Sequence, residues 1–136
     1  ETYFLAESAS DEEAAKVAAF ENLEPELDEP LRRATRRPIE AIVKTLTLRG
    51  AHRLAASLAA EIQRAMVAGT ELHNRGVKSA RFGVLRGLEM PGVVLELGFG
   101  SNPAEMEYIV SERYRERAQR SVLEALRRME QAQASR

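Results

Sequence analysis

Glu96 is the side chain whose sequence context best suits it to chemistry. It stands near the end of the apolar run of residues 93–97, and alternation along a strand would put it on the same face as Val94. A carboxylate in such a run is costly to bury unless it is paired, protonated or placed beside a metal ion. The alternative is that Glu96 ends the strand and points into solvent or pairs with one of the many arginines. The first interpretation makes Glu96 a functional candidate, and the second makes it a surface carboxylate.

Cysteine and histidine, which zinc sites use most often, are scarce in this sequence. The chain has no cysteine, which excludes disulfides, thiol nucleophiles and cysteine-type zinc sites. Its two histidines are His52, which falls on the polar side of a predicted helix, and His73, which is expected to cap a turn or pack against one. We therefore assign no metal ligand within the chain.

The stretch of residues 98–102, directly after Glu96, contains two glycines. Glycine permits close approach to the backbone, so N–H groups of this stretch are candidates for contact with a substrate. An ordinary turn from a strand to a helix explains the same residues equally well.

Three strands and one helix are predicted from short local patterns. Residues 2–5 are aromatic and β-branched, which predicts a strand. Ser10 followed by Glu13 matches a capping box, which starts a helix that runs to about Asn22. Further strands are expected at residues 82–85 and 93–97, and the nearly all-apolar second one suits a strand covered on both faces.

Longer helices are predicted from apolar residues at helical spacing. Pro38 begins one pattern, which is expected to break near Gly50, and a more secure helix follows and closes at Gly69. A short helix is expected from Pro103. The last helix is predicted to present one apolar face, made of Tyr114, Ala118, Val122, Leu126 and Met129.

These elements predict an α/β fold of about three strands and four to five helices. Three strands are few for so many helices, so the sheet is expected to need strands from outside residues 1–136. The chain also opens directly in a strand-like stretch. We therefore expect it to be the C-terminal part of a single domain.

Two motifs resemble signatures of the zinc-dependent N-acetylmuramoyl-L-alanine amidases, the family 3 cell-wall amidases. Residues 91–103 read PGVVLELGFGSNP, close to the family pattern in which a Pro-led strand ends in Val-Glu-x-Gly-Phe-x-Ser-Asn-Pro. Residues 72–85 read LHNRGVKSARFGVL and resemble the family's Leu-His-x-Arg-x-Val-Lys-x-Ala-x-Phe-x-Val-Leu. Residues 2–5 and 9–22 further resemble its Val-Tyr-Tyr-Leu strand and Ala-rich helix, so the resemblance covers nearly the whole chain.

The resemblance implies a three-layer fold with a mixed sheet, and hydrolysis of the amide between N-acetylmuramic acid and L-alanine in peptidoglycan. In the family, zinc held by two histidines and one glutamate activates a water, and Glu96 matches the glutamate that orients or deprotonates this water. The motifs with the zinc ligands lie N-terminal to the point where this chain begins. Zinc is therefore expected to be bound upstream, and the chain alone is expected to be inactive. Leu97 and Gly100 depart from the family's usual threonine and aliphatic residue.

Residues 23–37 form a segment that is first acidic and then basic. A solvated surface insertion is the plain interpretation. By resemblance to some family members, the segment is also a candidate regulatory plug, with Glu24, Glu26 or Glu29 on the zinc until a protein activator displaces it. The arginines of residues 32–37 could then contact a partner or an acidic glycan.

The net charge and the hydrophobic pattern of the chain argue against two other classes of function, nucleic-acid binding and membrane insertion. The net charge is −1 and the chain has no apolar run long enough to span a membrane, so neither nucleic acid nor membrane is an expected partner. The resemblance implies a periplasmic or extracellular location. One alternative is a non-catalytic peptidoglycan-binding or regulatory module derived from such an amidase. Another is a helical protein that binds nucleic acid through the arginine cluster, which is disfavoured because no aromatic residues interleave with the arginines.

Overall fold

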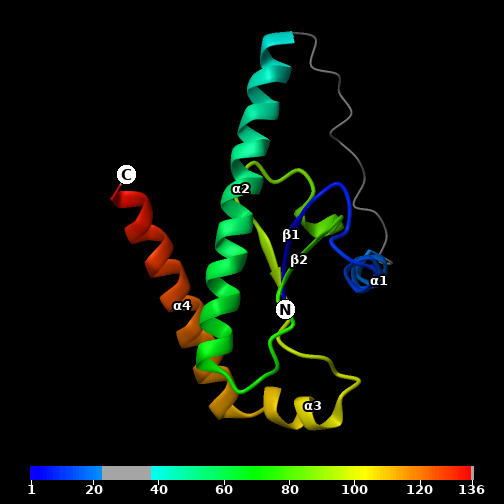
Figure 1. The fold of residues 1–136 in the computed structure, drawn as a ribbon, viewed down its shortest axis with the longest axis vertical. Coiled ribbons are helices and arrows are strands. Elements are labelled where there is room, and N and C mark those ends of the chain that lie inside the picture. The colour runs from blue at the N-terminus through cyan, green and yellow to red at the C-terminus, as the bar shows by residue number, and fades with distance from the viewer. Residues whose placement is uncertain (23–37, 136) are drawn as a thin grey trace. The chain divides into compact units, whose positions relative to one another are not determined.

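The computed structural model describes residues 1–22 and 38–135 (Figure 1). Within these ranges the element order is β1 (Thr2–Leu5), α1 (Glu12–Glu21), α2 (Pro38–Gly69), β2 (Val77–Ala80), the 3₁₀ turn η1 (Gly83–Leu85), β3 (Val93–Leu95), α3 (Pro103–Ile109) and α4 (Glu112–Ala134). The described part of the chain thus has three strands and four α-helices, which confirms the predicted α/β class.

The three strands form one sheet in the order β2-β1-β3. The amides of Thr2 and Ala6 in and after β1 donate to the carbonyls of Gly76 and Ala80, so β1 and β2 run in the same direction. Glu1 and Glu96 instead exchange both backbone hydrogen bonds, the pattern of an antiparallel pair. The sheet is therefore mixed, as expected.

The chain divides into two compact units. Unit 1 comprises residues 1–3, 57–77 and 95–136, and unit 2 comprises residues 4–56 and 78–94. Glu96 and the loop that follows it belong to unit 1.

In unit 1 the C-terminal end of α2 packs tightly against α4 (Figure 1). A Cβ atom added at Gly69 would lie 1.9 Å from Ser121 Oγ, so the two helices approach at a distance that only small side chains allow. The residues that α4 buries are accordingly Tyr114, Ala118, Ser121 and Ala125. The predicted face was correct for the first two and wrong for Leu126, which is 47% exposed. Hydrophobicity alone does not predict the buried face of α4, because its close contact with α2 requires small side chains, polar ones included.

In unit 2 helix α1 begins one residue later than predicted. The N-cap is Asp11, whose Oδ1 accepts the amide of Ala14 at 2.7 Å. Ser10 instead joins α1 to β2, because its backbone amide donates to Ser79 O and its Oγ accepts the amide of Ser79. Lys78 reinforces this connection through an ion pair with Glu13 at 2.5 Å.

The strand predicted at residues 82–85 was wrong. The strand is β2, five residues earlier, and residues 83–85 form the 3₁₀ turn. A short apolar run does not distinguish a strand from a turn of helix. Here Asn22 holds the turn, since its Oδ1 accepts the amide of Gly83 and its Nδ2 donates to the carbonyl of Arg81.

Helix α2 continues through Gly50, so the break expected there does not occur. A single helical glycine costs only about 1 kcal/mol relative to alanine, which the remaining turns of a long helix can offset. The closure of this helix at Gly69 was predicted correctly.

Candidate functional site

Glu96 directly follows β3, and its backbone is fixed by Glu1, the residue before β1. Its amide donates to Glu1 O at 2.9 Å, and the nitrogen of Glu1 donates to Glu96 O at 3.2 Å. Glu96 is half-buried, and so are all three residues of β3, so this strand is not covered on both faces in the way the sequence suggested. The structure therefore places Glu96 at the boundary between the sheet and the loop of residues 97–102.

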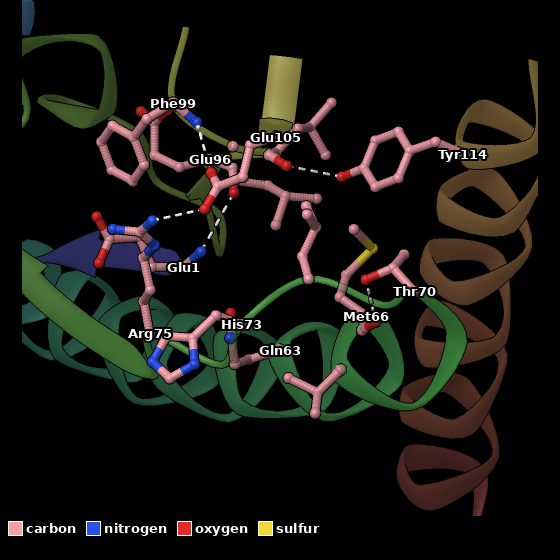
Figure 2. A pocket seen from close by; sticks show the side chains of 15 residues that line it. Glu1, Gln63, Met66, Thr70, His73, Arg75, Glu96, Phe99, Glu105 and Tyr114 are labelled. Carbon is pink, nitrogen blue, oxygen red and sulfur yellow. Dashed lines mark hydrogen bonds and ion pairs between the residues drawn. The ribbon is translucent and has the colours of Figure 1, made fainter. Parts of the chain in front are cut away.

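A small hollow in unit 1 is lined by Glu96 and by residues from every segment of the unit (Figure 2). Its volume is about 30 Å³, which is room for roughly two waters. Charged and polar groups that line it are Glu1, Gln63, Thr70, His73, Arg75, Glu96, Glu105 and Tyr114. The hollow thus brings Glu96 together with water-sized space and with several ionisable side chains.

The carboxylate of Glu105 holds the loop after Glu96 from the side of α3. Its Oε2 accepts the amide of Phe99 at 3.2 Å, and its Oε1 accepts from Arg75 Nη2 at 2.7 Å. The Arg75 guanidinium also lies 4.6 Å from the centre of the Phe99 ring, a cation–π contact. The Phe99 amide, and after it the Arg75 guanidinium, hold the pKa of Glu105 below its usual range, so this carboxyl is an anion at neutral pH.

Tyr114 holds the same loop from the side of α4. Its hydroxyl donates to Leu97 O at 2.8 Å, and its side chain is among the largest that are fully buried (Figure 2). Burial raises the pKa of Tyr114 to about 12, so the hydroxyl keeps its proton throughout the physiological range.

Gly98 allows the loop to pass close to α3. Its φ is +156°, and a Cβ atom there would lie 2.9 Å from Ile109 Cδ1. The backbone at Gly98 therefore does allow a close approach, as its glycine predicted, but here the approaching group is Ile109 of α3.

The amide groups expected to face a substrate are partly engaged within the chain. The amide of Phe99 donates to Glu105, and the amide of Asn102 donates to Phe99 O at 3.0 Å. Asn102 also caps α3, because its Oδ1 accepts the amide of Ala104. The amides of Phe99 and Asn102 are thus used within a strand-to-helix turn, and contact of this stretch with a substrate stays a prediction.

A chain of amide and hydroxyl side chains supports the turn that carries His73 and Arg75. Thr2 Oγ1 donates to Gln63 Oε1 at 2.9 Å, and Gln63 Nε2 donates to Asn74 Oδ1 at 2.8 Å. The buried Gln63 on α2 thereby links β1 to the turn of residues 73–75, beside the hollow that it also lines.

No group of three or more His, Cys, Asp or Glu side chains that could hold a metal ion occurs among the residues that the structure describes. His73 is exposed and lies at the hollow of unit 1, whereas the half-buried His52 lines a separate small hollow in unit 2. The donors present therefore do not fit a zinc site by themselves. The candidate plug residues Glu24, Glu26 and Glu29 and the arginines of residues 32–37 lie outside the described ranges.

Sequence reasoning proposed Glu96 as the catalytic residue, which stays a prediction, and it missed the side chains that surround the loop after Glu96. Arg75 lies in the quoted motif of residues 72–85 and was given no role. Glu105 was detectable, because it is the third helical residue after the N-cap Asn102, a position where a glutamate often accepts a backbone amide. Tyr114 was counted only as a core residue, although a buried tyrosine hydroxyl needs a hydrogen-bond partner.

Comparisons with known proteins give one family and several relatives. Residues 39–128 match the family model described as N-acetylmuramoyl-L-alanine amidase. The N-acetylmuramoyl-L-alanine amidase AmiC of Neisseria meningitidis is 33% identical over 87 residues, which are 64% of this chain and 20% of the relative. The probable cell wall amidase LytH of Staphylococcus saprophyticus is 35% identical over 74 residues, 54% of this chain and 24% of the relative. The uncharacterized protein YqiI of Bacillus subtilis is 33% identical over 69 residues, 51% of this chain and 34% of the relative. The chain thus spans about a fifth to a third of the length of these relatives.

Proposed function

We propose that this chain, which belongs to the N-acetylmuramoyl-L-alanine amidase family, supplies the catalytic carboxylate of a peptidoglycan hydrolase, and that this carboxylate is Glu96. The observation that carries the proposal is the position of Glu96. It is a half-buried carboxylate at the end of a strand, with its backbone amide and carbonyl both bonded to Glu1 and a water-sized hollow beside it. The relatives named as amidases support the substrate class, which is the amide between N-acetylmuramic acid and L-alanine.

In this proposal Glu96 moves a proton. Its carboxylate accepts a proton from the attacking water and returns it to the nitrogen of the leaving L-alanine, so the C–N bond breaks without releasing a strongly basic amide anion. A carboxylate suits both steps because it can hold the proton between them. Positioned general acid–base groups contribute typically 10²–10⁴-fold to rates.

The zinc that the resemblance implies would supply electrostatic activation of the water and the carbonyl. Since the described residues do not form a site for it, we expect its ligands upstream of residue 1, and we expect residues 1–136 alone to be inactive. The chain is then the C-terminal part of one amidase catalytic domain in a protein of the cell envelope. In the described part of the chain no helix is both long and apolar enough to cross a membrane.

We further propose that residues 23–37 are an insertion on which a protein activator acts. The support is its composition, acidic followed by basic, at the point after an Ala-rich helix where some family members carry a regulatory helix. Deleting residues 23–37 from the full-length protein should raise its activity without an activator.

The test is zinc content measured together with muropeptide release, for residues 1–136 and for the full-length protein that contains them. We expect zinc and activity only in the full-length protein, and a loss of at least about 10²-fold in kcat for Glu96→Gln with zinc content unchanged. Glu107→Gln on α3 is a matched control, because Glu107 is an exposed glutamate in the same unit. An active Glu96→Gln variant would refute the role of Glu96. A full-length protein without zinc or activity would instead point to a binding or regulatory module.

A further inference from the structure

The loop that follows Glu96 is fixed at several successive backbone groups. Glu96 itself is bonded to Glu1, the carbonyl of Leu97 accepts from Tyr114, and the amide of Phe99 donates to Glu105. These partners come from the β1 side, from α4 and from α3 respectively. The direction in which the chain leaves Glu96 is therefore set by side chains distant in the sequence.

Arg75 completes this arrangement from the turn before β2. Its guanidinium bonds Glu105 Oε1, and the Cζ atom of the same group lies 4.6 Å from the centre of the Phe99 ring. It thus contacts both the anion that accepts the Phe99 amide and the side chain of the same residue. The pair is well shielded, since the side chains of Arg75 and Glu105 are 30% and 14% exposed.

The contact does not serve to build a hydrophobic core. No residue of α3 is fully buried, although Tyr108 makes an edge-on ring contact with Tyr114 and Ile109 lies close to Gly98. This helix and the loop before it are thus held by polar contacts together with a few partly exposed apolar ones. Removing a polar contact from such a region changes local geometry more than global stability.

From this geometry we propose that Arg75 and Glu105 are positioning residues for Glu96: their ion pair fixes the loop of residues 97–102 and, through it, the orientation of the Glu96 carboxylate at the reacting amide. This inference rests on the proposed function of Glu96. Arginine suits this place better than lysine, because a lysine keeps the charge but loses the broad guanidinium that reaches both Glu105 and the Phe99 ring.

The experiment compares Arg75→Lys, Glu105→Gln and Glu96→Gln in the full-length, zinc-loaded protein. We expect Arg75→Lys to lower kcat about 10- to 100-fold, because displacing a catalytic group by about 1 Å can cost this much, while KM changes little. Hydrogen exchange of the Phe99 amide should become at least several-fold faster, whereas the unfolding midpoint should shift little. Glu105→Gln should give the same kcat loss with the same acceleration of exchange.

Arg115→Lys is the matched control, since Arg115 forms an exposed pair with Glu112 on α4 and should leave kcat and Phe99 exchange unchanged. If Arg75→Lys and Glu105→Gln keep full kcat while Glu96→Gln abolishes activity, the positioning role is wrong and the proposed function stands. A kcat loss that only tracks the folded fraction, with unchanged Phe99 exchange in the folded protein, also overturns the positioning role. If Glu96→Gln remains active, the proposed function fails and the positioning role fails with it.

Discussion

Two regions of unit 1 are held together in opposite ways. The contact between the end of α2 and α4 depends on small side chains, with Gly69 against Ser121. The loop of residues 97–102 and helix α3 have no buried helical residue and depend on hydrogen bonds to Glu105 and Tyr114. Added volume should disrupt the first region most, whereas loss of a donor or acceptor should disrupt the second, even though Gly98 also has little room for a Cβ beside Ile109.

This difference matters for a catalytic role of Glu96. A loop held by a few polar groups can be displaced by one conservative substitution while the helices remain packed. Substitutions in the loop should therefore affect kcat more than stability, and substitutions in the helix contact should do the reverse.

The largest effect is expected from Gly69→Ala. The new Cβ would lie 1.9 Å from Ser121 Oγ and 3.3 Å from Ser121 Cβ. The hydroxyl must move and give up its bond to the Arg117 carbonyl, so the free energy of unfolding should fall by about 1–3 kcal/mol. Urea denaturation measures this loss.

The double variant Gly69→Ala with Ser121→Ala is the control for that clash. Removing the hydroxyl relieves the shortest contact, so most of the lost stability should return, and the two substitutions should be strongly non-additive. Additive losses would show that close approach does not govern this helix contact.

The next effect is expected from Tyr114→Phe. The substitution keeps the buried ring and removes the hydroxyl that bonds Leu97 O, which should cost about 1–2 kcal/mol in unfolding free energy. Because the folded pKa of Tyr114 is about 12, above its ordinary value of 10, the unfolded tyrosine ionises first as pH rises. The wild-type advantage over Tyr114→Phe should therefore shrink as pH rises above about 10 and should be lost before about pH 12. A constant difference across that range would contradict the burial of this hydroxyl.

The class of fold could be predicted from the sequence because it depends on local patterns. Glu96 was chosen from a specific motif, and its catalytic role stays a prediction. The sequence did not show which residues of each element face the core or which distant residues meet. The face of α4 was misassigned because Ser121 is buried for its size, and β2 was missed because the inward Lys78 breaks the apolar alternation. Arg75 and Glu105 are 30 residues apart, and only the folded chain shows that they meet at Phe99.

A smaller effect is expected from Glu105 at acid pH. Its folded pKa lies below the ordinary value of 4.5, so its stabilising contribution is fully present above pH 4.5 and is lost as pH falls through the folded pKa. Glu105→Gln should thus be less stable than wild type at neutral pH, and the difference should vanish toward lower pH. Urea midpoints measured from pH 6 down to pH 3 check this. A difference that persists at the lowest pH would mean that the charge of Glu105 does not hold the loop.

The smallest effect is expected from Arg115→Gln, compared with Arg75→Gln. Both arginines pair with a glutamate, at 3.0 Å for Glu112 and 2.7 Å for Glu105, but the first pair is 61% and 77% exposed. Exposed pairs contribute little, so Arg115→Gln should change the unfolding free energy by less than about 0.5 kcal/mol, and salt at about 1 M should remove even that difference. Arg75→Gln leaves Glu105 shielded and without its cation, so it should cost more and should keep its effect in salt. If the two variants lose equal stability with the same salt dependence, the ion pair at the Glu96 loop is an ordinary surface pair and the contrast between the two regions disappears.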